Sequence, residues 1–95
     1  MEKMLTSAQK MALRKKAHSL SPVVLLGAKG LTEAVEKEIG LALEIHELIK
    51  VKVPEQDKSV RDEIVSRMVS HTNATLIQRV GHIVVLYKKR AKSTL

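Results

Sequence analysis

The sequence predicts a single compact α/β domain with the element order α-β-α-β-α-β-β and a four-stranded mixed sheet. Its 95 residues are too few for two independent cores. Segments with helical periodicity alternate with short apolar segments of strand length, which favours parallel crossover connections. The last two strand patterns are separated only by Gly81 and His82, a spacing typical of a hairpin, so an antiparallel pair should complete the sheet.

The first helix is predicted over residues 7–20. Thr6 and Gln9 have the spacing of a capping box, in which the threonine hydroxyl and the glutamine side chain satisfy two backbone amides at the start of a helix. Pro22 ends the helix, because the residue before a proline avoids the helical conformation. The apolar stripe that should contact the core is Leu13, Ala17 and Leu20.

A strand covered on both sides is predicted over residues 23–26, where every residue is apolar. The glycine-bounded segment 27–30 ends it and leads into a second helix that should run to His46, with Thr32 as its N-cap. His46 is expected at the edge of the buried face of this helix. Gly40 lowers the helix propensity, and we expect close packing against a neighbouring element to explain it.

The segment 48–53 alternates between apolar residues and the two lysines Lys50 and Lys52, which predicts a half-exposed strand with a basic outer face. We interpret this basic face as structural. A third helix is predicted over 59–70, with Val60, Ile64 and Met68 on its buried face, followed by strands over 74–80 and 83–88. A single domain should therefore span residues 1–95, with its core over about residues 5–89 and a flexible tail over 90–95.

Charge is distributed unevenly within the net charge of +7. Residues 1–20 carry five cations and one anion, residues 21–57 carry four cations and seven anions, and residues 58–95 carry eight cations and two anions. The two ends of the chain are therefore basic and the middle is acidic. This asymmetry indicates a polyanionic partner such as nucleic acid or the ribosome, although terminal lysines and arginines that only keep the domain soluble would give the same pattern.

Several function classes are disfavoured by composition. The chain has no cysteine, which excludes disulfides, thiolate zinc ligands and thiol nucleophiles, and is compatible with a reducing, cytoplasmic location. Its apolar stretches are too short to cross a membrane. Tyr87 is the single aromatic residue, so a module that stacks several RNA bases on aromatic rings is not expected.

No catalytic or metal-binding constellation is found in the sequence. The histidines at 18, 46, 71 and 82 include no pair at the i, i+4 spacing of a helical metal site. The glycine-bounded segment lacks the spacing of a nucleotide-binding P-loop, and no serine has the context of a nucleophile elbow. We therefore expect no enzymatic activity, no metal and no cofactor.

The strongest candidate binding site is the segment Gly27-Ala28-Lys29-Gly30. Glycines allow the backbone to approach a ligand, the amides at the start of the following helix favour an anion, and Lys29 adds a cation. The preceding helix ends just before the same strand, and its cations Lys10, Arg14 and Lys15 should extend this site. Such a surface would hold the sugar-phosphate backbone by charge and shape. The alternative interpretation is that the two glycines only form a turn and have no role in binding.

Several segments of the sequence resemble those of a known family. The strings at 13–18, 22–27, 30–32, 46–53 and 81–87, among them the G-x-x-G-L-T segment and HELIKVKV, are similar to the CRM domain in its bacterial single-domain, YhbY-type form. The resemblance covers about residues 5–89. It implies an RNA-binding module with a fold similar to the C-terminal domain of translation initiation factor three. It also implies RNA contacts from the segment 27–30, and association with precursors of the large ribosomal subunit.

These observations predict a monomeric RNA-binding protein that binds precursor ribosomal RNA of the large subunit, within the pre-ribosomal particle, during ribosome assembly. The alternative is an adaptor that docks on ribosomal proteins through its sheet or through the acidic helix 33–47, with its basicity serving solubility. A small phosphate-handling enzyme is a third reading, disfavoured because no general base has a definable place.

Overall fold

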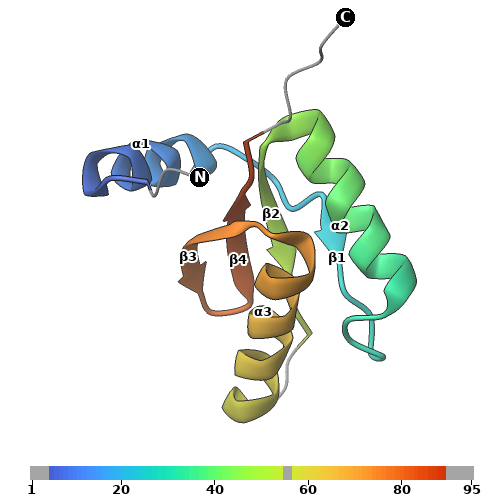
Figure 1. Cartoon of the computed structure of the whole chain (residues 1–95). Helices are drawn as coiled ribbons and strands as arrows, with labels where there is room; N and C mark the ends of the chain where they lie inside the picture. Colours follow the sequence, from blue (N-terminus) through green and yellow to red (C-terminus); the bar gives the residue numbers. More distant parts are fainter. Residues whose placement is uncertain (1–4, 55–56, 90–95) are drawn as a thin grey trace, which may run out of the picture.

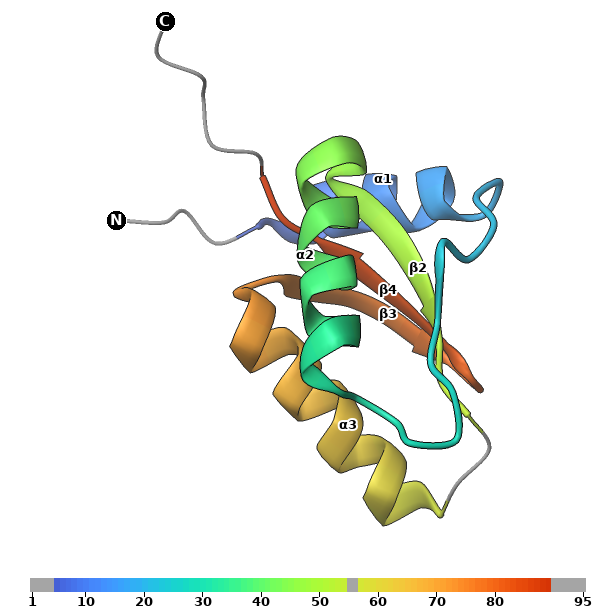
Figure 2. The ribbon, with the colours of Figure 1, turned by 90° about the vertical axis from the view of Figure 1, so that its right-hand side faces the viewer.

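A four-stranded sheet with helices on both faces forms the domain. The computed structural model describes residues 5–54 and 57–89, and Figures 1 and 2 show its layers. Helix α1 lies on one face of the sheet, and α2 and α3 lie on the other. The elements are α1 (Ser7–Ala17), β1 (Val24–Leu25), α2 (Glu33–His46), β2 (Leu48–Lys52), α3 (Lys58–Thr72), β3 (Thr75–Val80) and β4 (Ile83–Tyr87). The predicted element order and mixed four-stranded sheet are confirmed.

The strand order in the sheet is β1-β2-β4-β3. Strand β1 pairs parallel to β2, with Val24 opposite Val51, and β4 pairs antiparallel to both β2 and β3. The β3–β4 pair is the predicted hairpin, joined at Gly81 and His82. Because β4 lies between β2 and β3, the connection that runs from β2 through α3 to β3 skips one strand of the sheet.

Two hydrophobic cores lie on the two faces of the sheet. The larger core packs α2 and α3 against the inner side of β1, β2 and β4 and includes Ile39, Met68 and Leu86, each with no exposed surface. The smaller core fastens α1, through Ala17 with Leu13 and Leu20 beside it, to Leu48, Ile77 and Val85 of the sheet. The predicted apolar stripe of the first helix is thereby confirmed.

The start of α1 is the predicted capping box. The Gln9 amide donates to the Thr6 hydroxyl at 3.1 Å, and the Thr6 amide donates to the Gln9 side chain at 2.8 Å. The helix ends at Ala17, three residues earlier than expected, and His18 is its C-cap. The N-cap at Thr32 is confirmed as well, since its hydroxyl accepts from the Val35 amide at 3.2 Å.

The expectation that residues 23–26 form a strand covered on both sides is wrong. Strand β1 has only two residues and lies at the edge of the sheet. Val24 faces the larger core, whereas the side chains of Val23 and Leu25 are 46% and 65% exposed. The reason is the position of α1, which contacts β2 and β3 and leaves the β1 end of this face uncovered.

Four further expectations for the helical layer are wrong. His46 is exposed, and so is Val60, because it precedes the part of α3 that packs on the sheet. Helix α3 continues to Thr72, whose hydroxyl donates to the Met68 carbonyl at 2.7 Å. A Cβ added at Gly40 would meet no atom within 4 Å, so no close packing explains this glycine.

No helix within residues 5–54 and 57–89 is both long enough and apolar enough to cross a membrane. The predicted flexible tail, residues 90–95, lies outside the described residues.

Candidate functional site

One side of α1 carries a row of cationic and potentially cationic side chains. Lys10, Arg14 and His18 follow one another at i, i+4 and i+8, a spacing that places them along the same side of the helix. This side faces the part of the sheet that α1 leaves open, because His18 lines a hollow there together with strand residues. Lys15 lies about 100° further round the helix from Arg14, away from the buried stripe, and is exposed.

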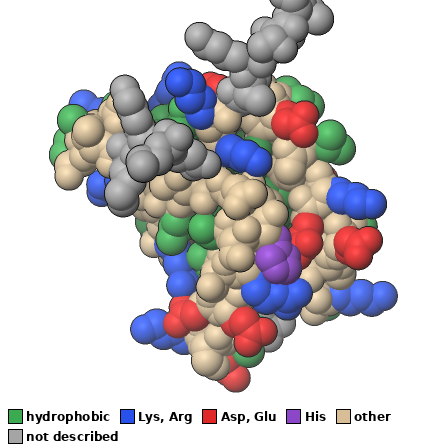
Figure 3. Space-filling view, viewed as in Figure 1, with side chains coloured by type: hydrophobic (Ala, Val, Ile, Leu, Met, Phe, Trp, Pro, Cys, Tyr) green, Lys and Arg blue, Asp and Glu red, His purple; other side chains and the backbone are tan. Residues whose placement is uncertain are grey.

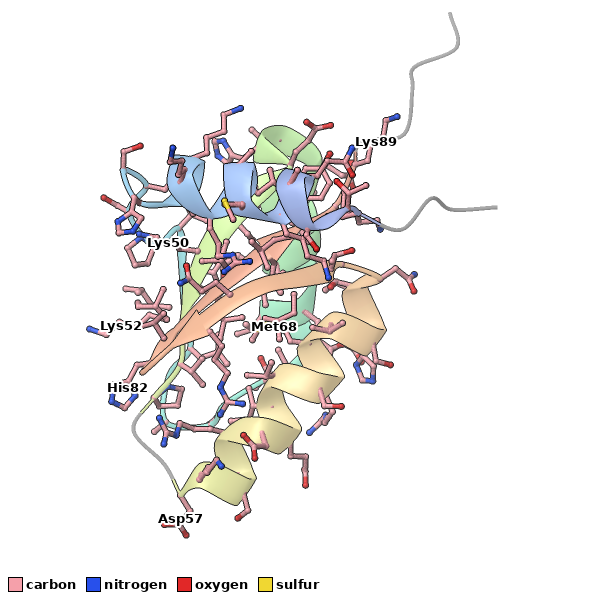
Figure 4. The ribbon with its side chains drawn as sticks, turned by 90° about the vertical axis from the view of Figure 1, so that its left-hand side faces the viewer. Lys50, Lys52, Asp57, Met68, His82 and Lys89 are labelled. Carbon is pink, nitrogen blue, oxygen red and sulfur yellow. The ribbon has the colours of Figure 1, made fainter. Side chains whose placement is uncertain are left out.

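Strand β2 continues this row across the sheet. Val51 packs into the larger core, so its neighbours Lys50 and Lys52 lie on the opposite face of the sheet, the face on which α1 sits. Figure 4 shows the two lysines in succession between the C-terminal end of α1 and the hairpin at His82. Lys50 is half-buried and Lys52 is exposed. We call Lys10, Arg14, Lys50 and Lys52 the cationic face.

Carboxylates are segregated on the other side of the sheet. Within residues 5–54 and 57–89, every aspartate and glutamate belongs to α2, to α3 or to a capping position of these helices. Figure 3 shows acidic side chains gathered over α2 and α3. The sheet therefore separates an acidic helical layer from α1 and the cationic face, and the positive potential is concentrated on one side of the molecule.

The cations of the cationic face are not engaged by carboxylates. The structure contains two ion pairs among its described residues, between Arg79 and Asp62 at 2.6 Å and between His71 and Glu36 at 2.5 Å, and both belong to the acidic helical layer or its contact with the sheet. The cationic face therefore has its charge available for phosphate groups of a ligand.

The glycine-bounded loop, residues 27–30, is a closed turn. The Gly30 amide donates to the Gly27 carbonyl at 2.9 Å. Gly30 is buried, with φ of +74°, a conformation that side chains other than glycine rarely adopt. Gly27, by contrast, has open space where a Cβ would lie. Gly30 is thus explained by the turn, and Gly27 leaves the backbone accessible. Ala28 and Lys29 are exposed at the tip.

The start of α2 is less favourable to an anion than its position after the loop suggests. The Thr32 hydroxyl already accepts from the Val35 amide, and the first turn carries Glu33 and Glu36. These carboxylates complement the positive end of the helix dipole and repel a phosphate. The chemistry that the loop offers a polyanion is therefore Lys29 and the accessible backbone at Gly27.

The structure does not bring all predicted site residues together. The loop 27–30 and helix α1 lie at opposite ends of the sheet in Figures 1 and 2, so Lys10 and Arg14 do not surround the loop. The link between them is β2, since Leu25, just before the loop, is the parallel neighbour of Lys52. Only an extended ligand can contact both ends.

Sequence reasoning missed Lys50 and Lys52 as candidate binding residues. The alternation of 48–53 correctly gave their outward direction, but it did not show that α1 lies on the same face and supplies further cations beside them. The missing information was the placement of α1, which depends on the smaller core under that helix.

No group of three or more histidine, aspartate or glutamate side chains in the described parts of the chain is arranged to hold a metal ion.

Comparison with known proteins agrees with this architecture. The sequence pattern of the CRS1/YhbY (CRM) domain matches residues 5–88. The chain belongs to the CRM family. A Haemophilus influenzae protein named an RNA-binding protein is 49% identical over 84 residues, which cover 88% of this chain and 85% of that protein. The Bacillus subtilis protein YqeI, whose name also describes RNA binding, is 38% identical over 86 residues, covering 90% of each chain.

A solved structure is similar over almost the whole CRM domain. The solution structure of a Staphylococcus aureus protein superposes with a TM-score of 0.80 and 33% sequence identity, covering 96% of this chain and 95% of that one. The layered arrangement described above is therefore shared with this solved structure. The family resemblance seen in the sequence is confirmed by the match to the CRM pattern.

Proposed function

We propose that this CRM-family chain binds RNA without catalysing a reaction, and that its target is precursor ribosomal RNA of the large subunit during ribosome assembly. The observation that carries the proposal is the separation of charge by the sheet, which leaves Lys10, Arg14, Lys50 and Lys52 on a face without carboxylates. Relatives named as RNA-binding proteins support RNA as the polyanion.

In this proposal the RNA strand crosses the cationic face from α1 along β2 and ends at the loop 27–30. Phosphate groups contact the cations, and Lys29 with the accessible backbone at Gly27 forms the far end of the surface. Phosphate contacts position an RNA without reading its sequence, which suits a surface built mostly from lysine and arginine.

The test is the salt dependence of binding to a precursor large-subunit RNA fragment. Each cation that neutralises a phosphate contributes about 0.7 to the slope of log K against log salt concentration for a single strand. Lys50→Gln and Arg14→Gln are each expected to lower the slope by this amount. The matched control is Lys37→Gln, which removes the same charge from the exposed side of α2 and should leave the slope unchanged.

A result in which Lys37→Gln lowers the slope as much as Lys50→Gln would overturn the proposal, because binding would then depend on net charge alone. The ribosomal target is tested separately: the chain should be recovered from cells with large-subunit precursors, and RNase treatment should abolish that association.

The adaptor function retains one favourable observation. Leu41 and Ile45, one turn apart on the outer side of the acidic helix α2, are 60% and 64% exposed, and exposed apolar residues among carboxylates suit a basic protein surface. If the adaptor function is the correct one, association with the pre-ribosomal particle survives RNase treatment and is abolished by Leu41→Asp.

A further inference from the structure

A hollow on the cationic side of the sheet has features that phosphate contacts alone do not explain. We infer that this hollow binds a single nucleobase of the RNA strand and that Gln78 hydrogen-bonds the edge of that base. The inference rests on the RNA binding proposed above and adds the chemistry by which one nucleotide is recognised.

The hollow has a volume of about 220 Å³ and lies between the end of α1 and the β-hairpin. Its lining combines apolar side chains with a few polar ones, and a base likewise combines flat apolar faces with a polar edge. None of its lining residues is acidic, so a nucleotide would meet no repelling carboxylate there. The lining residues are Ala17, His18, Lys50, Gln78, Val80, Ile83 and Val85.

A β-bulge turns Gln78 toward this hollow. Leu76 pairs with Leu86 and Gln78 pairs with Val85, so Ile77 is an extra residue in β3. Ile77 and Val85 both belong to the core under α1, which places the consecutive residues Ile77 and Gln78 on the same face of the sheet. In a regular strand Gln78 would lie on the face of α2 and α3. Bulges of this kind recur where a strand must redirect a side chain toward a functional site.

The donors and the acceptor of the Gln78 side-chain amide are available to a ligand. It is half-buried, and within residues 5–54 and 57–89 its amide makes no side-chain hydrogen bond. An amide offers two donors and one acceptor oxygen, a combination that pairs with the mixed donors and acceptors on the Watson–Crick edge of a base. The protein leaves this combination open to a ligand.

The neighbours of Gln78 supply the rest of a nucleotide site. Lys50 lines the same hollow and provides a cation for the phosphate group beside the base. His18 also lines the hollow, and an imidazole ring is a flat surface on which a base can stack. A stacking role for His18 explains how a surface with almost no aromatic residues can still hold a base.

The experiment measures binding of the full chain to single-stranded oligo(A), oligo(C), oligo(G) and oligo(U), and to an abasic ribose-phosphate oligomer of the same length at the same salt concentration. The chain should bind its preferred base oligomer about tenfold more tightly than the abasic oligomer, because the abasic oligomer lacks the base that stacks in the hollow. Gln78→Leu keeps the size and apolar contacts of the side chain, and it should remove the discrimination among the four bases.

Substitutions of His18 test the stacking of the base separately from the charge of the surface. His18→Ala should lower the affinity for base oligomers toward that for the abasic oligomer, and His18→Phe should restore it. The matched control is His46→Ala, because His46 lines a second hollow of about 320 Å³ on the other side of the end of α1. His46→Ala should leave binding unchanged, and thermal unfolding of each variant excludes a loss of fold.

Each contrary outcome has a distinct meaning. Equal affinity for base and abasic oligomers, or base discrimination that survives Gln78→Leu, overturns the inference and leaves RNA binding intact. Weaker binding with His46→Ala and unchanged binding with His18→Ala places the base in the other hollow and also overturns it. If the chain binds neither base-containing nor abasic oligomers, the proposed function itself fails.

Discussion

Ile77 and Gln78 are consecutive residues of β3 that lie on the same face of the sheet. Ile77 is buried under α1, and Gln78 lines the hollow beside the end of that helix. The extra residue in β3 therefore has two consequences. It adds an apolar contact that holds α1, and it brings an amide to the side of the sheet where the cationic face lies.

The packing of Ile77 against α1 should contribute a large part of the free energy that holds this helix on the sheet. Among the described residues, the core under α1 has four buried members, so truncating one of them leaves a cavity that few neighbours can fill. Ile77→Ala is expected to lower the free energy of unfolding by about 2–4 kcal/mol, measured by urea denaturation. A decrease no larger than that of an exposed-residue control such as Leu76→Ala would contradict the packing described here.

The two loop glycines should respond differently to alanine. Gly30→Ala places a side chain at φ of +74° and is expected to cost about 1–2 kcal/mol, whereas Gly27→Ala meets open space and should change stability little. Denaturant unfolding of both variants gives the comparison. Equal destabilisation would mean that the turn requires both glycines, contrary to the geometry. RNA affinity is informative in Gly27→Ala, because its fold is expected to be intact.

Gly40 offers a stabilising substitution. It lies inside α2 with no atom within 4 Å of an added Cβ, so Gly40→Ala should raise the free energy of unfolding by about 0.5–1 kcal/mol. The control is Gly81→Ala, which adds the same methyl group to a hairpin residue with φ of +56° and should be destabilising. Destabilisation by Gly40→Ala, seen as a lower thermal midpoint, would show that the site is more crowded than described.

The capping box positions the helix that carries half of the cationic face. Thr6→Ala removes the acceptor for the Gln9 amide and should lower stability by about 1 kcal/mol, while Thr6→Ser keeps the hydroxyl and should retain most of it. Hydrogen exchange of the α1 amides is the sharper readout. Faster exchange confined to α1 is expected, and protection equal to that of the unaltered chain would contradict the role of the cap.

The order of elements followed from local patterns in the sequence, because capping residues, prolines and glycines act within a few residues. Thr6, Thr32 and the Gly81–His82 turn are in this class, and all three lie where predicted. Burial depends instead on distant partners. Leu25 is apolar but exposed, because α1 stops short of β1, and no local pattern encodes where a helix crosses a sheet.

The candidate site was predictable only in part for the same reason. The cations of α1 and the turn at 27–30 were recognisable as residues, but their separation to opposite ends of the sheet is a property of the fold. No pattern in the sequence indicated Gln78 as a binding residue. The one extra residue of the β-bulge moves its side chain to the opposite face of the sheet. Without the observed register it reads as one polar residue of an alternating strand.

The most direct test of the account is an NMR titration of the full chain with single-stranded RNA, following each backbone amide. Shifts should concentrate at Lys10, Arg14, Lys50 and Lys52 and at Gln78, and the amides of the outer side of α2, such as Glu38 and Leu41, should remain still. The account is contradicted if the largest shifts fall on α2 and α3 while the cationic face is unchanged.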